Sequence, residues 1–316
     1  MTSSADADFS AYYDRLRYNI SVISGFTCLG LGFVGNIMSC MVFGEKTMRQ
    51  NPGSIYFIAY SVVNFLSLLF GLLTNMLYDY NLDPSSYNIP YCKIHYYLQI
   101  ICIVMGDFYL LLISIDRVLI TSSKATLRQR SNHRTAYRSI GGVTLIMLLF
   151  HIHLFVGVGI YEIYPGFNYC YLQPGGYRIF DAIANIMLEI IPLIFLSIFG
   201  MWTWKNLSRI RVQPATVALT AANTHRSKDR QLTIIFLAEI VIYMFFNTGT
   251  CFFGIYEQIT QYQTKSVRQQ AIEEFLIGFF YTITFIAPST SFYLYLAVSK
   301  SFRKKALQVL FKRGQH

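Results

Sequence analysis

The sequence predicts an all-α membrane protein, a bundle of seven transmembrane helices followed by a short amphipathic helix. Of its 316 residues, 54% are hydrophobic and only 13% are charged, and the mean hydropathy is +0.40. A soluble domain averages about 25% charged residues. Seven mostly apolar stretches divide the chain, each long enough to cross about 30 Å of hydrocarbon as a helix. Lipid is therefore the solvent that this composition requires.

The apolar stretches set the order of the predicted elements. The expected spans cover residues 20–44, 54–78, 91–121, 138–160, 179–204, 231–256 and 271–298. We expect residues 1–19 to form an extracellular N-terminus, 20–298 the transmembrane domain, and 299–316 a cytoplasmic amphipathic helix and tail. No internal repeat is visible in the sequence, which disfavours the two-half design of many transporters.

The basic residues predict the direction of the chain. Most of the 26 Lys and Arg residues lie in the segments after spans one, three and five and in the tail. This positive-inside pattern predicts a plasma-membrane protein with an extracellular N-terminus and a cytoplasmic C-terminus. The formal charge of +10 is thus explained without a nucleic-acid partner.

The segment after the seventh span has two chemically different faces. Phe302, Leu307 and Leu310 can share one side of a helix, with Lys304 and Lys305 opposite. Such a helix lies on the inner leaflet, where its basic residues meet anionic membrane lipid.

Two features of the third span point to function. Arg117 follows Asp116 at the foot of the span, and a charge in a bilayer is costly enough to be kept mainly for function. Cys92, at the outer end of the third span, and Cys170 are the cysteines that we expect on the extracellular side. An extracellular pair faces an oxidising compartment, so we expect a disulfide between them.

These features together resemble the rhodopsin-like (class A) G-protein-coupled receptors over about residues 20–312. Asp116-Arg117-Val118 resembles the family's Asp-Arg-Tyr motif, at the family's spacing from Cys92. Further matches are Gly35-Asn36, Pro192 in span five, Pro288 in span seven and Phe302-Arg303.

Several positions depart from the family pattern. Asn64 stands where the family usually has an Asp, and Asn247 and Gly249 occupy the places of a Trp and a Pro in span six. Ala287-Pro288-Ser289-Thr290-Ser291 replaces Asn-Pro-x-x-Tyr. These losses put the family's sodium site and usual switch in doubt. They suggest a divergent invertebrate receptor, similar to orphan chemosensory or FMRFamide-type receptors.

The resemblance implies a receptor that binds an extracellular ligand and activates a heterotrimeric G protein. It also implies an activation switch at Asp116, Arg117 and Asp229. We expect an Arg117–Asp229 clamp that holds the sixth helix closed until agonist shifts a two-state equilibrium. The alternative for Arg117 is an interfacial anchor that snorkels to phosphates.

Three acids fall within the predicted spans: Asp107, Glu189 and Glu239. Each should be protonated, hydrated or partnered, because an unpaired ionised carboxylate is costly there. Asp107 can form an intramembrane polar core with Asn36 and Asn64, or a local hydrogen-bond network without an ion. Glu189 lies one turn above Pro192 and can face the ligand.

Two missing residues argue against an amine ligand and against retinal. Gln99 stands where amine receptors carry their amine-binding Asp, and no Lys between Ala271 and Lys300 can form a retinal Schiff base. A short neuropeptide is the first expectation and a small chemosensory molecule the alternative. A transporter or channel, with a path lined by the intramembrane carboxylates, is the alternative of another class.

By height in the spans, the expected pocket residues are Tyr96, Gln99, Ile103, Tyr177, Glu189 and Tyr281.

Other chemistry is not indicated. The sequence contains no catalytic constellation, so we expect neither an enzyme nor a bound cofactor or metal. His151 and His153 are two residues apart and would point in different directions on a helix. Asn19-Ile20-Ser21 is a glycosylation sequon close to the first span.

Overall fold

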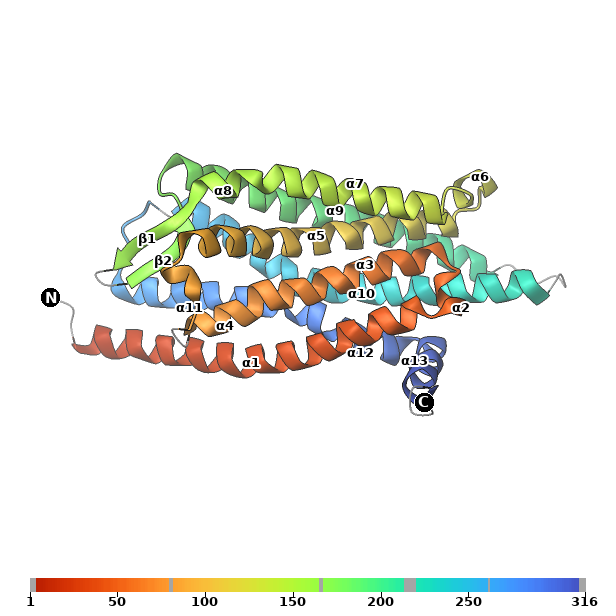
Figure 1. Ribbon diagram of the computed structural model, residues 1–316, viewed down its shortest axis with the longest axis horizontal. Helices are drawn as coiled ribbons and strands as arrows, with labels where there is room; N and C mark the ends of the chain where they lie inside the picture. Colours follow the sequence, from red (N-terminus) through yellow and green to blue (C-terminus); the bar gives the residue numbers. More distant parts are fainter. Residues whose placement is uncertain (1–3, 80–81, 165–166, 213–219, 261, 313–316) are drawn as a thin grey trace.

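The structure is a computed structural model that describes residues 4–79, 82–164, 167–212, 220–260 and 262–312. Within these residues, seven helices are long and apolar enough to cross a membrane. They run side by side along the long axis of the molecule, with a β-hairpin at one end and α13 (Lys300–Lys312) across the other (Figure 1). The predicted seven-helix bundle with a short final helix is confirmed.

The spans are made of one or more helical segments each. In chain order they are α1 (Ser4–Gly44), α3 (Pro52–Ser67) with a π-helical turn Leu68–Leu73 and α4 (Thr74–Asp79), α5 (Ile89–Thr121), α7 (His133–Phe150) with a 3-10 turn His151–His153 and α8 (Leu154–Gly157), α9 (Gly176–Val212), α10 (Thr220–Thr260), and α11 (Val267–Thr284) with α12 (Ile286–Val298). The connections contain α2 (Lys46–Arg49), a 3-10 turn Pro84–Ser86, α6 (Ala125–Arg128), β1 (Val158–Tyr164) and β2 (Phe167–Leu172).

Polar caps start several of these helices. Asn51, Asn88 and Asn132 each accept a hydrogen bond from a backbone N–H in the first turn of α3, α5 and α7. Ser266 does the same for α11. Short polar side chains satisfy donors that have no partner inside the helix, so these residues fix where each span begins.

Several helices run beyond the predicted spans. The described part of residues 1–19 is helical and continuous with α1, and α9 and α10 both run beyond the predicted spans 179–204 and 231–256. Polar residues extend a helix outside the hydrocarbon, and hydropathy alone does not detect them. The fourth span ends at Gly157 rather than 160, because Val158 starts the hairpin. Residues 213–219, in the predicted third inner loop, and the tail residues 313–316 lie outside the described residues.

The second and seventh spans, like the fourth, are not continuous α-helices. The second passes through the π-helical turn between α3 and α4, and the seventh breaks at Phe285 between α11 and α12. Pro288 follows the second break by one turn, where its missing N–H can be tolerated. Pro192, by contrast, lies inside the continuous helix α9.

Aromatic side chains fasten α13 to the bundle. Phe302 is 1% exposed and packs against Phe43 of α1, with ring centroids 5.1 Å apart. Phe43 stacks on Phe57 of α3 at 4.9 Å, and Tyr295 of α12 meets Phe302 at 5.6 Å. One buried cluster therefore joins α1, α3, α12 and α13 at this end of the bundle.

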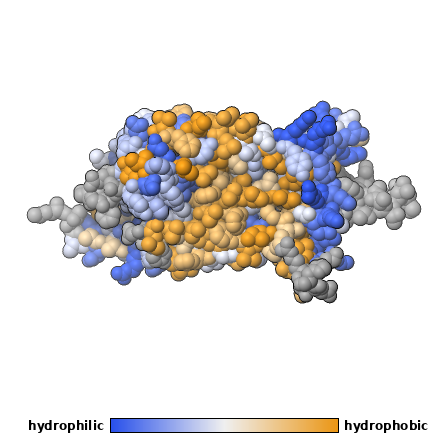
Figure 2. Space-filling view, viewed as in Figure 1, coloured by the Kyte–Doolittle hydropathy of each residue, from blue (hydrophilic) through white to orange (hydrophobic). Residues whose placement is uncertain are grey.

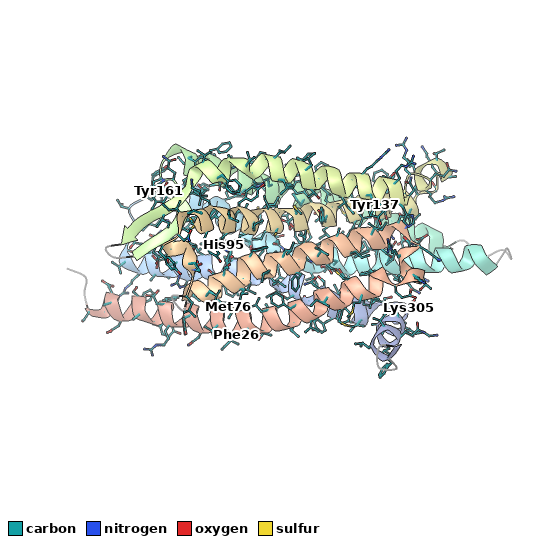
Figure 3. The ribbon with its side chains drawn as sticks, in the orientation of Figure 1. Phe26, Met76, His95, Tyr137, Tyr161 and Lys305 are labelled. Carbon is teal, nitrogen blue, oxygen red and sulfur yellow. A yellow bond between two sulfur atoms is a disulfide. The ribbon has the colours of Figure 1, made fainter. Side chains whose placement is uncertain are left out.

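The outer surface carries a broad apolar band over the middle of the bundle, with hydrophilic residues gathered toward the end that holds α2 and α6 (Figure 2). Large apolar side chains are exposed on several spans, such as Phe26 on α1, Leu149 on α7 and Phe245 on α10. Phe26 points outward from α1 in Figure 3. This band is the surface that a bilayer covers.

Candidate functional site

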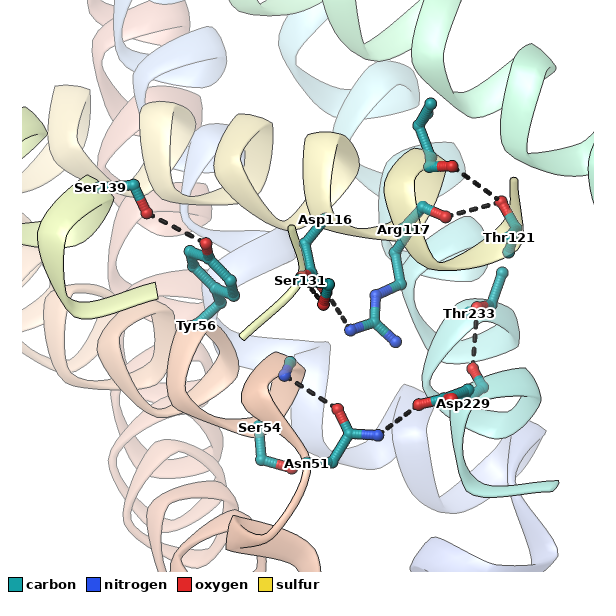
Figure 4. A network of polar contacts seen from close by, with 12 residues as sticks. Asn51, Ser54, Tyr56, Asp116, Arg117, Thr121, Ser131, Ser139, Asp229 and Thr233 are labelled. Carbon is teal, nitrogen blue, oxygen red and sulfur yellow. Dashed lines mark hydrogen bonds and ion pairs between the residues drawn. The ribbon is translucent and has the colours of Figure 1, made fainter. Parts of the chain in front are cut away.

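Arg117 is fully buried near the end of α5, at the α13 end of the bundle. Its Nη2 forms an ion pair with the neighbouring Asp116, whose Oδ1 accepts a 2.5 Å hydrogen bond from Ser131 (Figure 4). Ser131 lies between α6 and α7, so Asp116 also ties that connection to α5.

The guanidinium of Arg117 is only partly paired. Within the described residues its Nε and Nη1 are buried without a hydrogen-bond partner. Its Nη2 lies against the backbone of Gly53 at the start of α3, where an added Cβ would come within 1.9 Å of it. A buried charge with unused donors is costly, so this arrangement holds a group that can gain new acceptors elsewhere.

Asn51 connects this region to α10. Its amide Nδ2 donates to the Asp229 carboxylate, while its Oδ1 accepts a 2.9 Å hydrogen bond from the Gly53 N–H (Figure 4). The three predicted switch residues thus lie around the N-terminus of α3. The contacts that the structure gives connect Arg117 to Asp229 through Gly53 and Asn51. The direct Arg117–Asp229 clamp remains a prediction.

A second polar node lies deeper in the bundle, at Glu239 of α10. Its Oε1 accepts hydrogen bonds from the hydroxyls of Tyr60 on α3, at 3.0 Å, and Ser291 on α12, at 2.6 Å. Sequence reasoning named Glu239 as an intramembrane acid but did not place it in a site. The available signal was Ser291, which occupies the place of the family's span-seven Tyr.

The middle of the bundle contains a cavity of about 30 Å³. It has room for about two water molecules, since each needs at least roughly 10–15 Å³. Its lining includes Asn64, Asp107, Asn247 and Pro288, together with Ile103, which was expected in the ligand pocket. Asn64 Nδ2 is buried without a hydrogen-bond partner in the described chain.

Three other predicted polar or switch residues, Asn36, Gly249 and Glu189, are not among the residues that line this cavity. Asn36 donates to the carbonyl of Pro288, at 3.0 Å, and so reaches the cavity only through a lining residue. Gly249 lies where an added Cβ would meet the Phe280 ring of α11 at 2.8 Å. The missing side chain therefore lets α10 and α11 pack closely at this position. Glu189 is half-buried on α9.

The hairpin end is closed by the Cys92–Cys170 disulfide, with 5.5 Å between the two Cα atoms. Residues Ile160 and Cys170 are paired in the antiparallel hairpin, so the bond ties both strands to the head of α5. Tyr96 packs against the buried cluster that Cys92 forms with Leu154, Val158 and Leu172. The expected disulfide is confirmed.

Gln99 and Tyr177 were both expected in the ligand pocket, but they contact different helices at this end. Gln99 donates from Nε2 to the Tyr281 hydroxyl at 2.8 Å, which joins α5 to α11. Tyr177, in contrast, packs against Gly157 at the end of α8, and its hydroxyl lies 2.6 Å from His153 Nδ1. Tyr177 is thus a contact between spans four and five.

Sequence reasoning missed Asp181, an acid near the start of α9 that is only 3% exposed. It accepts a 2.7 Å hydrogen bond from Asn185 on the same helix. The missed signal was a carboxylate at the head of an otherwise apolar span. Nearby in the hairpin, burial raises the pKa of the Tyr171 phenol, and the Arg178 guanidinium lies 5.1 Å from the centre of its ring.

The sequon at Asn19 lies within α1 rather than in a loop. Asn19 is exposed and Ser21 is buried, both in a continuous helix. Modified sequons are expected in surface loops, so glycosylation of Asn19 stays a prediction.

Comparison with protein families decides the class of this chain. The model of the 7 transmembrane receptor (rhodopsin family) matches residues 35–298. The chain belongs to this rhodopsin family of receptors. Its members are receptors rather than enzymes, in agreement with the prediction.

The curated relatives of this rhodopsin-family chain are distant. It is 22% identical to the oxytocin receptor of Ovis aries over 213 residues, and 24% identical to the mesotocin receptor of Rhinella marina over 216 residues. Each alignment covers 65% of this chain and 52% of the relative. The C3a anaphylatoxin chemotactic receptor of Mus musculus is 30% identical over 158 residues, covering 49% of this chain and 32% of the relative. The chain thus spans about half the length of the first two relatives, or less for the third.

Proposed function

We propose that this protein is a plasma-membrane receptor that binds an extracellular peptide and activates a heterotrimeric G protein. The observation that carries the proposal is the buried Arg117, half-satisfied beside Asp116, with Asn51 linked to Asp229 next to it. This site lies at the opposite end of the bundle from the disulfide-linked hairpin. A charge kept in such a place has a functional use.

The orientation follows from charge. The α13 end carries most of the Lys and Arg residues, which supports a cytoplasmic location for it. The disulfide at the hairpin end supports an extracellular location for the hairpin, since disulfides persist in oxidising compartments.

The mechanism is a shift between two states of the bundle. At rest, the Asn51–Asp229 and Tyr60–Glu239 hydrogen bonds hold α10 near α3. A ligand that binds the open state better moves the equilibrium toward it, and α10 swings away from α3. The Arg117 guanidinium, with two donors already unused, then becomes available to the G protein.

The ligand class rests on two kinds of support. The similar receptors are named for oxytocin, mesotocin and C3a, all of them peptide receptors. In this chain, Asp181 and Glu189 supply carboxylates on α9, and Gln99 with Tyr281 supplies neutral hydrogen-bonding groups between α5 and α11. A peptide with one basic group and several amides matches these partners.

The deciding experiment compares the wild type with Arg117→Ala at matched surface levels, reading G-protein activation against a library of amidated peptides and small metabolites. An Arg117-dependent response to a peptide supports the proposal. A saturable response to a small metabolite alone replaces the peptide by a chemosensory ligand. Agonist-independent ion or solute flux, with no G-protein signal, overturns the receptor proposal in favour of a transporter or channel.

A further inference from the structure

Glu239 joins three helices through one carboxyl group. The residue is 0% exposed, and one of its oxygens, Oε1, accepts both the Tyr60 and the Ser291 hydroxyls. Tyr60 belongs to α3 and Ser291 to α12, so neither bond is local to α10. Asp229 forms another contact of α10 with the α3 region, ten residues closer to the α13 end. Glu239 is the deeper of these two contacts.

The second oxygen of the carboxyl is in a different situation. Among the described residues, Glu239 Oε2 is buried without a hydrogen-bond partner, and so is the Tyr295 hydroxyl. The ion pairs found in the described chain do not include Glu239. The ionisable groups that face it are the phenols of Tyr60 and Tyr295, which bring no positive charge. An ionised carboxylate here would be buried, uncompensated and half unsatisfied, which is costly.

A neutral carboxyl fits the same place. Its carbonyl oxygen still accepts the Tyr60 and Ser291 hydroxyls, and its O–H provides a donor in a region where a buried oxygen lacks a partner. We propose that Glu239 is a neutral latch: a positioning residue whose protonated carboxyl holds α10 against α3 and α12 in the resting receptor. This inference rests on the proposed signalling function for its consequence, but the latch itself is a property of the bundle.

Variants of Glu239 and its partners can distinguish the effect of the carboxyl group's hydrogen bonds from the effect of its charge. Glu239→Gln keeps the size, the neutral state, the acceptor and a donor. Glu239→Leu removes every hydrogen bond. Ser291→Ala and Tyr60→Phe each remove one donor to Oε1. Thr290→Val is the matched control, because its hydroxyl bonds within its own helix, to the Ile286 carbonyl at 2.7 Å.

The primary readout is the position of α10, measured without a G protein. A fluorophore is attached at Arg230→Cys, an exposed position beside Asp229, in receptor purified into lipid nanodiscs. The same receptor without Arg230→Cys gives the background from native thiols. Basal G-protein activation at matched surface levels is the second readout.

We expect Glu239→Gln and Thr290→Val to keep the wild-type probe signal and basal activity. Ser291→Ala and Tyr60→Phe should each raise the open-to-closed ratio by about fivefold, the equivalent of one net hydrogen bond. Glu239→Leu should raise it further. The two single-donor variants also keep the test decisive if Glu239→Leu fails to reach the surface.

Two results would overturn the latch. If Glu239→Gln moves the probe as far as Ser291→Ala and Tyr60→Phe do, the wild-type carboxyl is charged and the neutral state is wrong. If Ser291→Ala and Tyr60→Phe leave both the probe signal and the basal activity unchanged, the bonds do not hold α10. A probe that shifts as expected while no G-protein class responds in any variant keeps the latch and rejects the proposed signalling.

Discussion

The Asn51 amide donates a hydrogen bond to the Asp229 carboxylate, and this contact joins the start of α3 to α10. Asn51 also caps α3 through its oxygen, so one side chain both begins a helix and links it to a neighbour. The link lies next to Gly53, on which the Arg117 guanidinium rests. Helix capping and the candidate switch are therefore built from the same residues.

Asn51→Asp separates these two roles. Aspartate still caps α3, but it loses the NH₂ donor and brings a second negative charge to Asp229. We expect raised basal G-protein signalling and a fall in the free energy of unfolding of about 2 kcal/mol, the range for a hydrogen bond to a charged group. Basal signalling at matched surface levels and thermal denaturation in nanodiscs check this. Lower basal signalling with unchanged stability would contradict it.

Gly53→Ala should disturb Arg117. The added Cβ would lie 1.9 Å from Nη2 and 2.8 Å from Cζ of Arg117, so the guanidinium must move. We expect a loss of about 1–3 kcal/mol in stability, as for other overpacked interiors. The control is Gly141→Ala in α7, where a Cβ meets nothing within 4 Å and helix propensity improves. Equal thermal midpoints for the two variants would show that the Arg117 contact is loose.

Removal of the disulfide should loosen the hairpin end. Cys92→Ser or Cys170→Ser opens a link between residues 78 positions apart, and such cross-links typically contribute about 2–4 kcal/mol. We expect lower surface expression and loss of peptide response, together with a mobility difference on non-reducing gels. Cys40→Ala, which removes a free half-buried thiol, should behave as the wild type. The hairpin is not held by this bond if both Ser variants bind ligand normally.

Stability should also respond to acid through Glu45, between α1 and α2. The Thr47 hydroxyl and backbone, with Lys305 at 3.6 Å, hold the pKa of Glu45 below its ordinary value of 4.5. A lowered folded-state pKa contributes stability above pH 4.5, and this contribution is lost as the pH falls through the folded-state pKa. We expect the wild type to melt above Glu45→Gln near neutral pH, with the two midpoints meeting in acid. A gap that widens on acidification would reverse the assigned sign.

The sequence predicted the number and order of the spans because a helix that crosses a bilayer needs about 20 mostly apolar residues. It also predicted the Cys92–Cys170 disulfide, since these two thiols were the ones placed on the extracellular side. It did not predict the hairpin, because a short apolar strand and the end of a helix look alike in hydropathy. Thus Val158 and its neighbours were assigned to the fourth span.

The sequence predicted some of the residues that lie at the polar sites, but not the residues that they contact. Asn64 and Asp107 were expected together and share a cavity. The partners of Asp229 and Glu239, in contrast, come from helices far away in sequence, Asn51 and Tyr60 on the α3 side. Side-chain pairing across a bundle depends on how each helix is rotated against its neighbours, which residue spacing along the chain does not encode.

The length of α1 has a practical consequence. Its 41 residues make a helix of about 60 Å, roughly twice the thickness of the hydrocarbon. The outer part is braced against α11 by the Arg268–Asp6 ion pair at 2.7 Å and by contact of Tyr13 with Phe275. A fluorescent dye attached near Ser4 would therefore sit on a helix that is held against α11. Its fluorescence polarisation would report the joint tilt of α1 and α11 rather than the motion of a flexible terminus.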